Sequence, residues 1–503
     1  MNTNEQNTAG RLTMPIIRRD INSDVSEDFT LPDYYPEIRK VLYARESLLA
    51  PAKFVSGNKI DVSGVIDYDL VYVSADGRLC SAPFSAEYSF SLPLENMSCF
   101  ELSEGFSVIA HTVADSSSVR VSAPRRLQIR SHLCTSVGVW GKVLCGEKVF
   151  GLEADESFER LEDSFCATEL VCESSDVISV QDEYRLAFAD GRVALAQSSV
   201  VISNVRIDDD VAKVNGEILI KLLEISDTTG EIERIQRKIP FDAETDLDGI
   251  DMSEKPLCRV SGRVTDLSVE VEEGIVLIEA NLVLELCGVS ERTAMYTRDA
   301  YSTEKACECE MRSYEIPRVL CNKNASISQG ERITLEESGI PEDSEIVDVC
   351  ATAVAKKAEQ TENGYTITGN CRYNVILLRD GEYSSAEMNI PFRYDTDALD
   401  TANGEVESYD IVASVSNARG RRDGDYIDLG SEISLACSIW GKESIEMLER
   451  ADFGEPIEKR SGAIIVCFPS GDDTLWSIAK RYCVGQGDVS GDPTNDSFVM
   501  IET

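Results

Sequence analysis

One stretch of this chain occurs three times at nearly constant spacing. The central glycines of the three copies are Gly64, Gly216 and Gly369, which lie 152 and 153 residues apart. So regular a spacing over 503 residues indicates three copies of one domain. Repeated copies of one domain are more typical of a scaffold than of an enzyme.

Apolar side chains alternate with other side chains around each of these glycines. The three segments are Lys59–Tyr72, Ala212–Leu223 and Tyr365–Leu377. Alternation with a period of two is typical of β-strands that bury one face. A glycine inside such a strand weakens pairing, so we expect each one to mark a bulge or a sharp bend.

Two further landmarks follow each glycine in the same order. The first is a Pro-Phe pair, at Pro83-Phe84, Pro240-Phe241 and Pro391-Phe392. We expect it near the start of an edge strand, because proline lacks a backbone donor. The second is Val139–Lys142 in the first copy and Ile439–Lys442 in the third, both containing Trp-Gly-Lys. Leu284–Cys287 is expected to take that place in the second copy.

The predicted fold class is mainly β. We expect three tandem β-sandwich-like repeats and a small, degenerate α+β module at the C-terminus. Long amphipathic helices are few, and only short helices are expected, at Tyr34–Leu42 and Ile445–Arg450. The predicted division is an N-terminal tail 1–25, repeats at 26–155, 165–312 and 313–455, and a C-terminal module at 461–503.

The charge limits the classes of partner. The chain carries 48 basic and 90 acidic residues, a net charge of −42, so nucleic acid is not an expected partner. The sequence shows no signal peptide and no apolar run long enough for a transmembrane segment. Sixteen cysteines are scattered without a Cys-x-x-Cys motif, which favours reduced thiols in the cytoplasm.

No catalytic residues, metal ligands or cofactors are predicted. The chain has two histidines, His111 and His132, both in the first repeat, where a structural role is the simpler interpretation. Motifs for a nucleophile elbow, a phosphate-binding loop or a zinc protease are absent. A hydrolase with paired acids remains a minor alternative, because so many carboxylates make any one pair uninformative. We therefore expect no enzyme activity.

The C-terminal segment has a different pattern from the repeats. Ile464–Phe468 is typical of a short strand, and Gly471–Tyr482 of a turn followed by a helix. Asp473 is the predicted helix cap, and Leu475 and Ile478 are predicted to be core.

This segment resembles the start of a LysM domain, whose hallmark is Gly-Asp-Thr-Leu-Trp-x-Ile-Ala. The chain differs from it by an additional Asp at 472 or 473 and by a Gly- and Asp-rich stretch, 484–497, in place of the second helix. The resemblance implies a contact surface for a partner or a glycan at Gly471, Asp473, Thr474 and Trp476.

The repeats resemble the SPOCS domain of sporulating Firmicutes, which often precedes a C-terminal LysM module. The residues that carry this resemblance are Leu31–Ile38 followed by Val62–Tyr72. The resemblance implies a protein of spore coat morphogenesis in the mother-cell cytosol, at the forespore surface or in the spore coat. It also implies that the LysM-like module contacts a spore coat or forespore-surface protein, the coat-basement ATPase.

Two functions are therefore expected as alternatives. The first is a non-enzymatic scaffold or adaptor in spore coat or spore envelope assembly. The second is a peptidoglycan-binding protein that recognises N-acetylglucosamine polymers through the LysM-like module.

Overall fold

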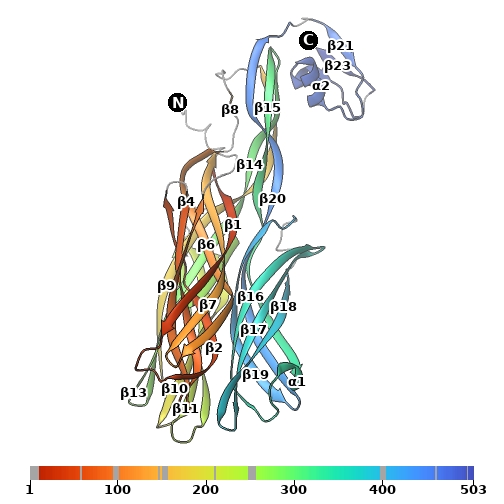
Figure 1. The fold of residues 1–503 in the computed structure, drawn as a ribbon. Coiled ribbons are helices and arrows are strands. Elements are labelled where there is room, and N and C mark those ends of the chain that lie inside the picture. The colour runs from red at the N-terminus through yellow and green to blue at the C-terminus, as the bar shows by residue number, and fades with distance from the viewer. Residues whose placement is uncertain are drawn as a thin grey trace.

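The computed structural model describes most of the chain. It covers residues 11–56, 59–93, 101–144, 148–149, 157–208, 211–246, 257–396, 404–458, 462–494 and 497–502. The protein is mainly β, as predicted, and its strands form antiparallel sheets that build three repeats, a stalk and a small C-terminal module (Figure 1).

Each repeat contains six principal strands in two three-stranded sheets. The second, third and fourth strands form one sheet in sequence order, and the first, sixth and fifth form the other in that spatial order. The strands of the first repeat are β1 (Arg11–Thr30), β2 (Ile38–Leu48), β4 (Lys59–Ser74), β5 (Leu79–Pro93), β6 (Glu101–Ala123) and β7 (Arg126–Leu144). A short β3 (Ala52–Ser56) continues β2 along β4.

The second and third repeats have the same order of strands. The second consists of β9 (Phe158–Arg185), β10 (Gly191–Asp208), β11 (Val211–Ser226), β12 (Ile232–Asp246), β13 (Leu257–Glu272) and β14 (Ile275–Ser302). The third consists of β15 (Lys305–Thr334), β16 (Glu345–Thr361), β17 (Gly364–Arg379), β18 (Glu382–Asp395), β19 (Ser408–Asp423) and β20 (Tyr426–Pro456). A one-turn helix, α1 (Leu335–Ser338), joins β15 to β16 in the third repeat.

The repeated glycine lies beneath an aromatic ring in all three repeats. Gly64 pairs with Tyr88, Gly216 with Phe241, and Gly369 with Phe392. A methyl group on any of these glycines would lie 2.5 Å from a ring atom of that partner. The glycine is required because the ring covers its backbone.

The irregularity expected at the glycine lies in the neighbouring strand. The strand that carries the glycine is continuous in each repeat. The break between β2 and β3 falls opposite Gly64, and register shifts in β10 and β16 fall beside Gly216 and Gly369.

The register corrects two of the predicted landmarks. Pro240-Phe241 and Pro391-Phe392 occupy equivalent positions within edge strands, away from the strand starts. Tyr88 takes this position in the first repeat, and Phe84 instead lies opposite Tyr68.

The structural equivalent of Trp140 and Trp440 in the second repeat is Val289, beyond Leu284–Cys287. All three residues lie in the sixth strand of their repeat, opposite a register shift in the first strand.

The three repeats form a closed ring with approximate threefold symmetry. The second strand of each repeat has a bulged residue at an equivalent position, which is left out of the pairing with the third strand: Leu42, Ala194 and Val347. The carbonyl of each bulged residue accepts a hydrogen bond from an equivalent position in another repeat. The donors are Ser81 Oγ to Ala194 (3.4 Å), Arg234 Nε to Val347 (2.7 Å) and Ser385 Oγ to Leu42 (2.8 Å).

Two apolar clusters lie where the three repeats meet. One contains the three bulged residues together with Tyr43, Val71, Leu223 and Ile376. These residues come from the sheet that the second, third and fourth strands form in each repeat. The other joins Trp140, Val289 and Trp440, and the two tryptophan rings meet edge to face with their centroids 5.4 Å apart. The outer faces of the three repeats therefore pack against one another.

A buried ion pair links the second and third repeats. Arg259 Nη1 lies 2.6 Å from Asp410 Oδ2, and both side chains are 9% exposed. Burial by itself raises the pKa of Asp410, but the charges of Arg259, His111 and Arg18 together lower it below its ordinary value. Ile109 takes the equivalent position in the first repeat.

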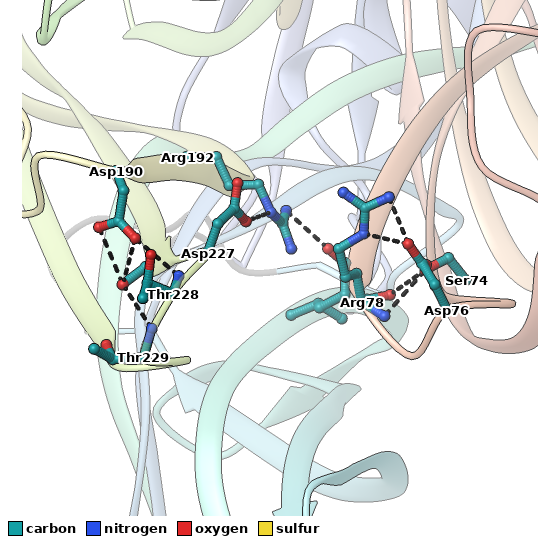
Figure 2. A network of polar contacts seen from close by, with 10 residues as sticks. Ser74, Asp76, Arg78, Asp190, Arg192, Asp227, Thr228 and Thr229 are labelled. Atoms are coloured by element: carbon teal, nitrogen blue, oxygen red, sulfur yellow. Dashed lines mark hydrogen bonds and ion pairs between the residues drawn. The ribbon is translucent and has the colours of Figure 1, made fainter.

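Polar contacts join the first two repeats (Figure 2). Arg192 donates from Nη1 to the carbonyl of Leu79 in the first repeat and from Nε to Asp227 in its own repeat. Asp190 accepts from Ser226 Oγ and Thr228 N and holds the neighbouring turn.

A stalk of two antiparallel ribbons extends from the ring (Figure 1). We define the stalk as residues 158–172, 289–302, 305–319 and 440–456, where β9 pairs with β14 and β15 with β20. Its interior contains Phe165, Tyr314, Ile316, Ile445 and Met447, with a second cluster toward the tip. A two-residue strand, β8 (Lys148–Val149), pairs in parallel with β20.

The structure revises the predicted boundaries and helices. Residues 11–25 belong to β1, which pairs with β7, so the predicted tail is a core strand from Arg11 onward. The second repeat begins by Phe158 and the third at Lys305. Residues 1–10 and the predicted boundary at 155 lie outside the described residues.

The two expected short helices are wrong. Ile38–Leu42 belong to β2, and Ile445–Arg450 lie within β20, because cross-strand pairing and burial of alternate side chains override local helical preference.

Replacing Gly369 by alanine should destabilise the third repeat. The new methyl group would meet the carbonyl oxygen of Val354 and the ring of Phe392, which cannot both move aside. Overpacking of this kind costs about 1–3 kcal/mol. Chemical unfolding should show a lower midpoint for Gly369→Ala, while Gly487→Ala, whose methyl group meets no atom within 4 Å, should leave it unchanged. An unchanged midpoint in Gly369→Ala would contradict the role of the ring.

Asp410→Ala should weaken the junction of the second and third repeats. It leaves the buried Arg259 guanidinium without its carboxylate, a loss of about 3–5 kcal/mol. The matched control is Asp452→Ala, whose partner Arg450 is half exposed, where about 0–1 kcal/mol is expected. Thermal unfolding of both variants measures the difference, and equal shifts would contradict the assignment.

Candidate functional site

The C-terminal module is a small sheet covered by one helix. It consists of β21 (Ile464–Cys467), α2 (Leu475–Tyr482), a 3-10 helix (Gln486–Asp488), β22 (Val489–Ser490) and β23 (Val499–Glu502). The strand order is β21-β23-β22. Cys467, Ile478, Ala479, Val499 and Ile501 form its core.

The turn before α2 holds three of the predicted site residues, Gly471, Asp473 and Thr474. Thr474, and not Asp473, is the helix cap: its hydroxyl accepts from Ser477 N at 3.1 Å, and Ser477 Oγ accepts from Thr474 N. Asp473 accepts from Arg481 Nη2 at 2.5 Å and from Ser470 N, and these contacts lower its pKa to about 2. The carboxylate therefore joins the turn to the last turn of the helix.

Trp476 connects the module to the stalk. Its side chain is buried, its Nε1 donates to Asp299 Oδ2 at 2.8 Å, and its ring meets that of Tyr301 with centroids 4.9 Å apart. Lys480 Nζ lies 2.5 Å from Asp299 Oδ1, and Tyr301 donates to the carbonyl of Val484. Burial raises the pKa of Asp299, but the contacts with Lys480 and Trp476 lower it overall.

The four predicted residues thus have different environments. Gly471 and Thr474 are exposed, whereas the carboxylate of Asp473 and the indole of Trp476 are engaged within the chain. Ile478 is fully buried, as predicted for the core, but Leu475 is 39% exposed. The stalk residues that contact the module, Asp299 and Tyr301, are far from it in the sequence and could not be foreseen.

An exposed apolar surface lies on the side of the module sheet away from α2. We define the apolar face as Ile464, Val466, Phe468, Phe498 and Met500, which are 44–75% exposed. Val466 pairs with Met500 across the sheet, and the rings of Phe468 and Phe498 are 6.5 Å apart. So many large apolar side chains gathered on one small surface indicate a contact site.

A signal for this face is present in the sequence. The run Ile464–Phe468 contains only apolar residues and cysteine. A strand on the surface of a small module can bury only one of its faces. Cys467 points into the core, so alternate residues such as Val466 point outward.

A cavity at the ring axis is the second candidate. Its volume is about 650 Å³, and all three repeats line it. Two of its arginines are in ion pairs: Arg372 lies 2.9 Å from Glu46, and Arg263 lies 2.7 Å from Glu285. Arg45 donates to the carbonyl of Ser198.

His111 also lines this cavity, and its Nε2 has no hydrogen-bond partner among the described residues. Burial lowers the pKa of this imidazole. The other histidine, His132, is partly exposed and contacts Asp24 at 2.8 Å. Neither arrangement presents an activated nucleophile.

Two searches of the described residues give negative results. No three His, Cys, Asp or Glu side chains in the described ranges could together hold a metal ion. In the same part of the chain, no helix is both long and apolar enough to span a membrane.

Asp299→Asn should loosen the module from the stalk. The change removes the charge that holds Lys480 and weakens the acceptor for Trp476. Hydrogen bonds to charged groups contribute about 1.5–3 kcal/mol, so amide exchange in α2 should be roughly tenfold faster.

The matched control is Asp163→Asn, which removes a stalk carboxylate 3.7 Å from the exposed Arg298. Mass spectrometry of exchange in residues 475–482 compares the variants. Equal protection in both would show that Asp299 does not hold the module.

Comparison of the chain with protein-family models, curated proteins and solved structures finds no match. Its function must therefore be inferred from its own sequence and geometry. Of the two candidate sites, the apolar face is exposed, whereas the axial cavity is lined by all three repeats, and its Arg372 and Arg263 are already paired within the protein.

Proposed function

We propose that this protein is a non-enzymatic scaffold or adaptor in spore coat or spore envelope assembly. Its C-terminal module docks a coat-basement protein at the forespore surface, in the mother-cell cytosol. The observation that carries the proposal is the apolar face, presented at the far end of a stalk (Figure 1).

The position of the apolar face favours docking. The repeats cover their outer apolar surfaces with one another at the ring axis, as the clusters around Leu42 and Trp140 demonstrate. The apolar face has no such cover among the described residues. Burying one large apolar side chain contributes about 1.5–3 kcal/mol, so five of them can support specific association.

The attachment of the module also supports an adaptor. Asp299 and Tyr301 hold α2 against the stalk, while the apolar face lies on the other side of the module sheet. A partner bound there is kept at a distance from the ring. The sequence resemblance to SPOCS repeats and a LysM module supplies the spore envelope as the setting.

Peptidoglycan binding has no comparable support. Trp476, assigned by resemblance to a contact surface, packs against Tyr301 and donates to Asp299 of the same chain. This alternative is tested beside the docking proposal.

Localisation in sporulating cells tests the proposal. Full-length fluorescent fusions of the wild type and of Val177→Lys should collect at the forespore, whereas Val466→Lys should remain diffuse. Val177 is a matched control, because it is 67% exposed on the second repeat. A wild type that stays diffuse, or a Val466→Lys fusion that localises normally, would contradict docking through the apolar face.

A pull-down on purified peptidoglycan distinguishes glycan binding from docking through the apolar face. Binding that survives Val466→Lys but is lost in Trp476→Ala would favour glycan recognition. The docking proposal predicts no enrichment of any variant on peptidoglycan.

A further inference from the structure

We propose that the free edge of β21 binds an extended segment of the partner as an added β-strand, and that this segment alternates apolar and basic residues. The inference rests on the proposed function, because it specifies how the module contacts its partner. Strand addition uses main-chain hydrogen bonds for affinity and side-chain contacts for specificity.

The edge of β21 is open and lacks protective features. β21 pairs with β23, and among the described residues no strand lies on its other side. The strand Ile464–Cys467 contains no charged residue and no proline. Exposed apolar edges without such residues are sites where another strand adds.

Three edge strands of the repeats are contacted by basic side chains from other repeats. Arg45 donates to the carbonyl of Ser198 in β10, and Lys221 to that of Val349 in β16. Arg263 donates to the carbonyl of Leu48 at the end of β2. The edge of β21 differs from these three edges, because no basic side chain is placed on it among the described residues.

The apolar face extends the edge into a recognition surface. Ile464 and Val466 project from β21 on the same side as Met500 from β23. A strand added beside β21 would place every second side chain next to Ile464 and Val466. Apolar residues at those alternate positions would complete the partly covered face.

The negative charge of the chain favours a basic partner strand at the edge of β21. Glu502 lies opposite Ile464 at the end of the sheet, and Asp472 is exposed in the turn that follows β21. Two copies, each with a net charge of −42, would bring these acids together, which disfavours self-association. A partner strand with Lys or Arg between its apolar residues instead complements the acidic surroundings.

A synthetic peptide of alternating lysine and valine tests the proposal on the full chain. Fluorescence anisotropy at 0.15 M salt should detect binding to the wild type and to Val177→Lys. The affinity of Val466→Lys should be at least tenfold lower. Unchanged affinity in Val466→Lys would overturn the site.

Two peptide controls separate strand addition from simple attraction. The same peptide with all its backbone amides N-methylated cannot donate along either edge and should bind at least tenfold more weakly. A peptide of alternating glutamate and valine should also bind at least tenfold more weakly. Equal binding of the N-methylated peptide would overturn strand pairing, and equal binding of the glutamate peptide would overturn the basic partner.

Sedimentation of the wild type tests the competing occupant. A concentration-dependent dimer that Val466→Lys abolishes would show that a second copy fills the edge, contrary to the proposal. Failure of the two proposals is distinguishable. If Val466→Lys loses forespore localisation but the wild type does not bind the peptide, strand addition alone is overturned. If the wild type binds the peptide through Val466 but the Val466→Lys fusion still localises normally, only the proposed function is overturned.

Discussion

The ring depends on one bulged residue in each repeat. Leu42, Ala194 and Val347 leave the pairing of their strands, bury their side chains at the axis and present their carbonyls to another repeat. A bulge frees a carbonyl that a regular ladder would use within the sheet. Ser81, Arg234 and Ser385 donate to these carbonyls from equivalent positions. The first repeat thus contacts the second, the second contacts the third, and the third contacts the first, which closes the ring.

Closure of the ring determines which surfaces remain for other molecules. Equivalent positions have diverged where the repeats meet: Ile109, Arg259 and Asp410 occupy one position, and the last two form a buried ion pair. Such a pair fixes the alignment of the two repeats more than it adds net stability, because the cost of desolvating both charges offsets much of their attraction. Because the outer apolar surfaces of the repeats are covered by one another, the apolar face at the tip of the stalk is the exposed surface best suited to a partner.

Much of each repeat, but little of the site, could be predicted from local pattern. The alternation around Gly64, Gly216 and Gly369 identified the central strands, because a period of two reflects a buried face. It did not identify the covering ring, so Phe84 was matched where Tyr88 is the true equivalent. The segment Ile445–Arg450 has helical spacing of apolar residues, yet pairing with β15 makes it a strand. Ile478 was recognised as core, whereas the burial of Trp476 depends on Asp299 and Tyr301.

Repetition and periodicity are local properties of the chain, and they were enough to indicate that one β domain occurs three times and is followed by a different, smaller module. Contacts made on folding close the domains into a ring, extend the strands 289–302 and 440–456 into a stalk, and turn Trp476 inward and Val466 outward. Those outcomes depend on contacts between residues a hundred or more positions apart. No local pattern records which of two apolar faces another part of the chain will cover.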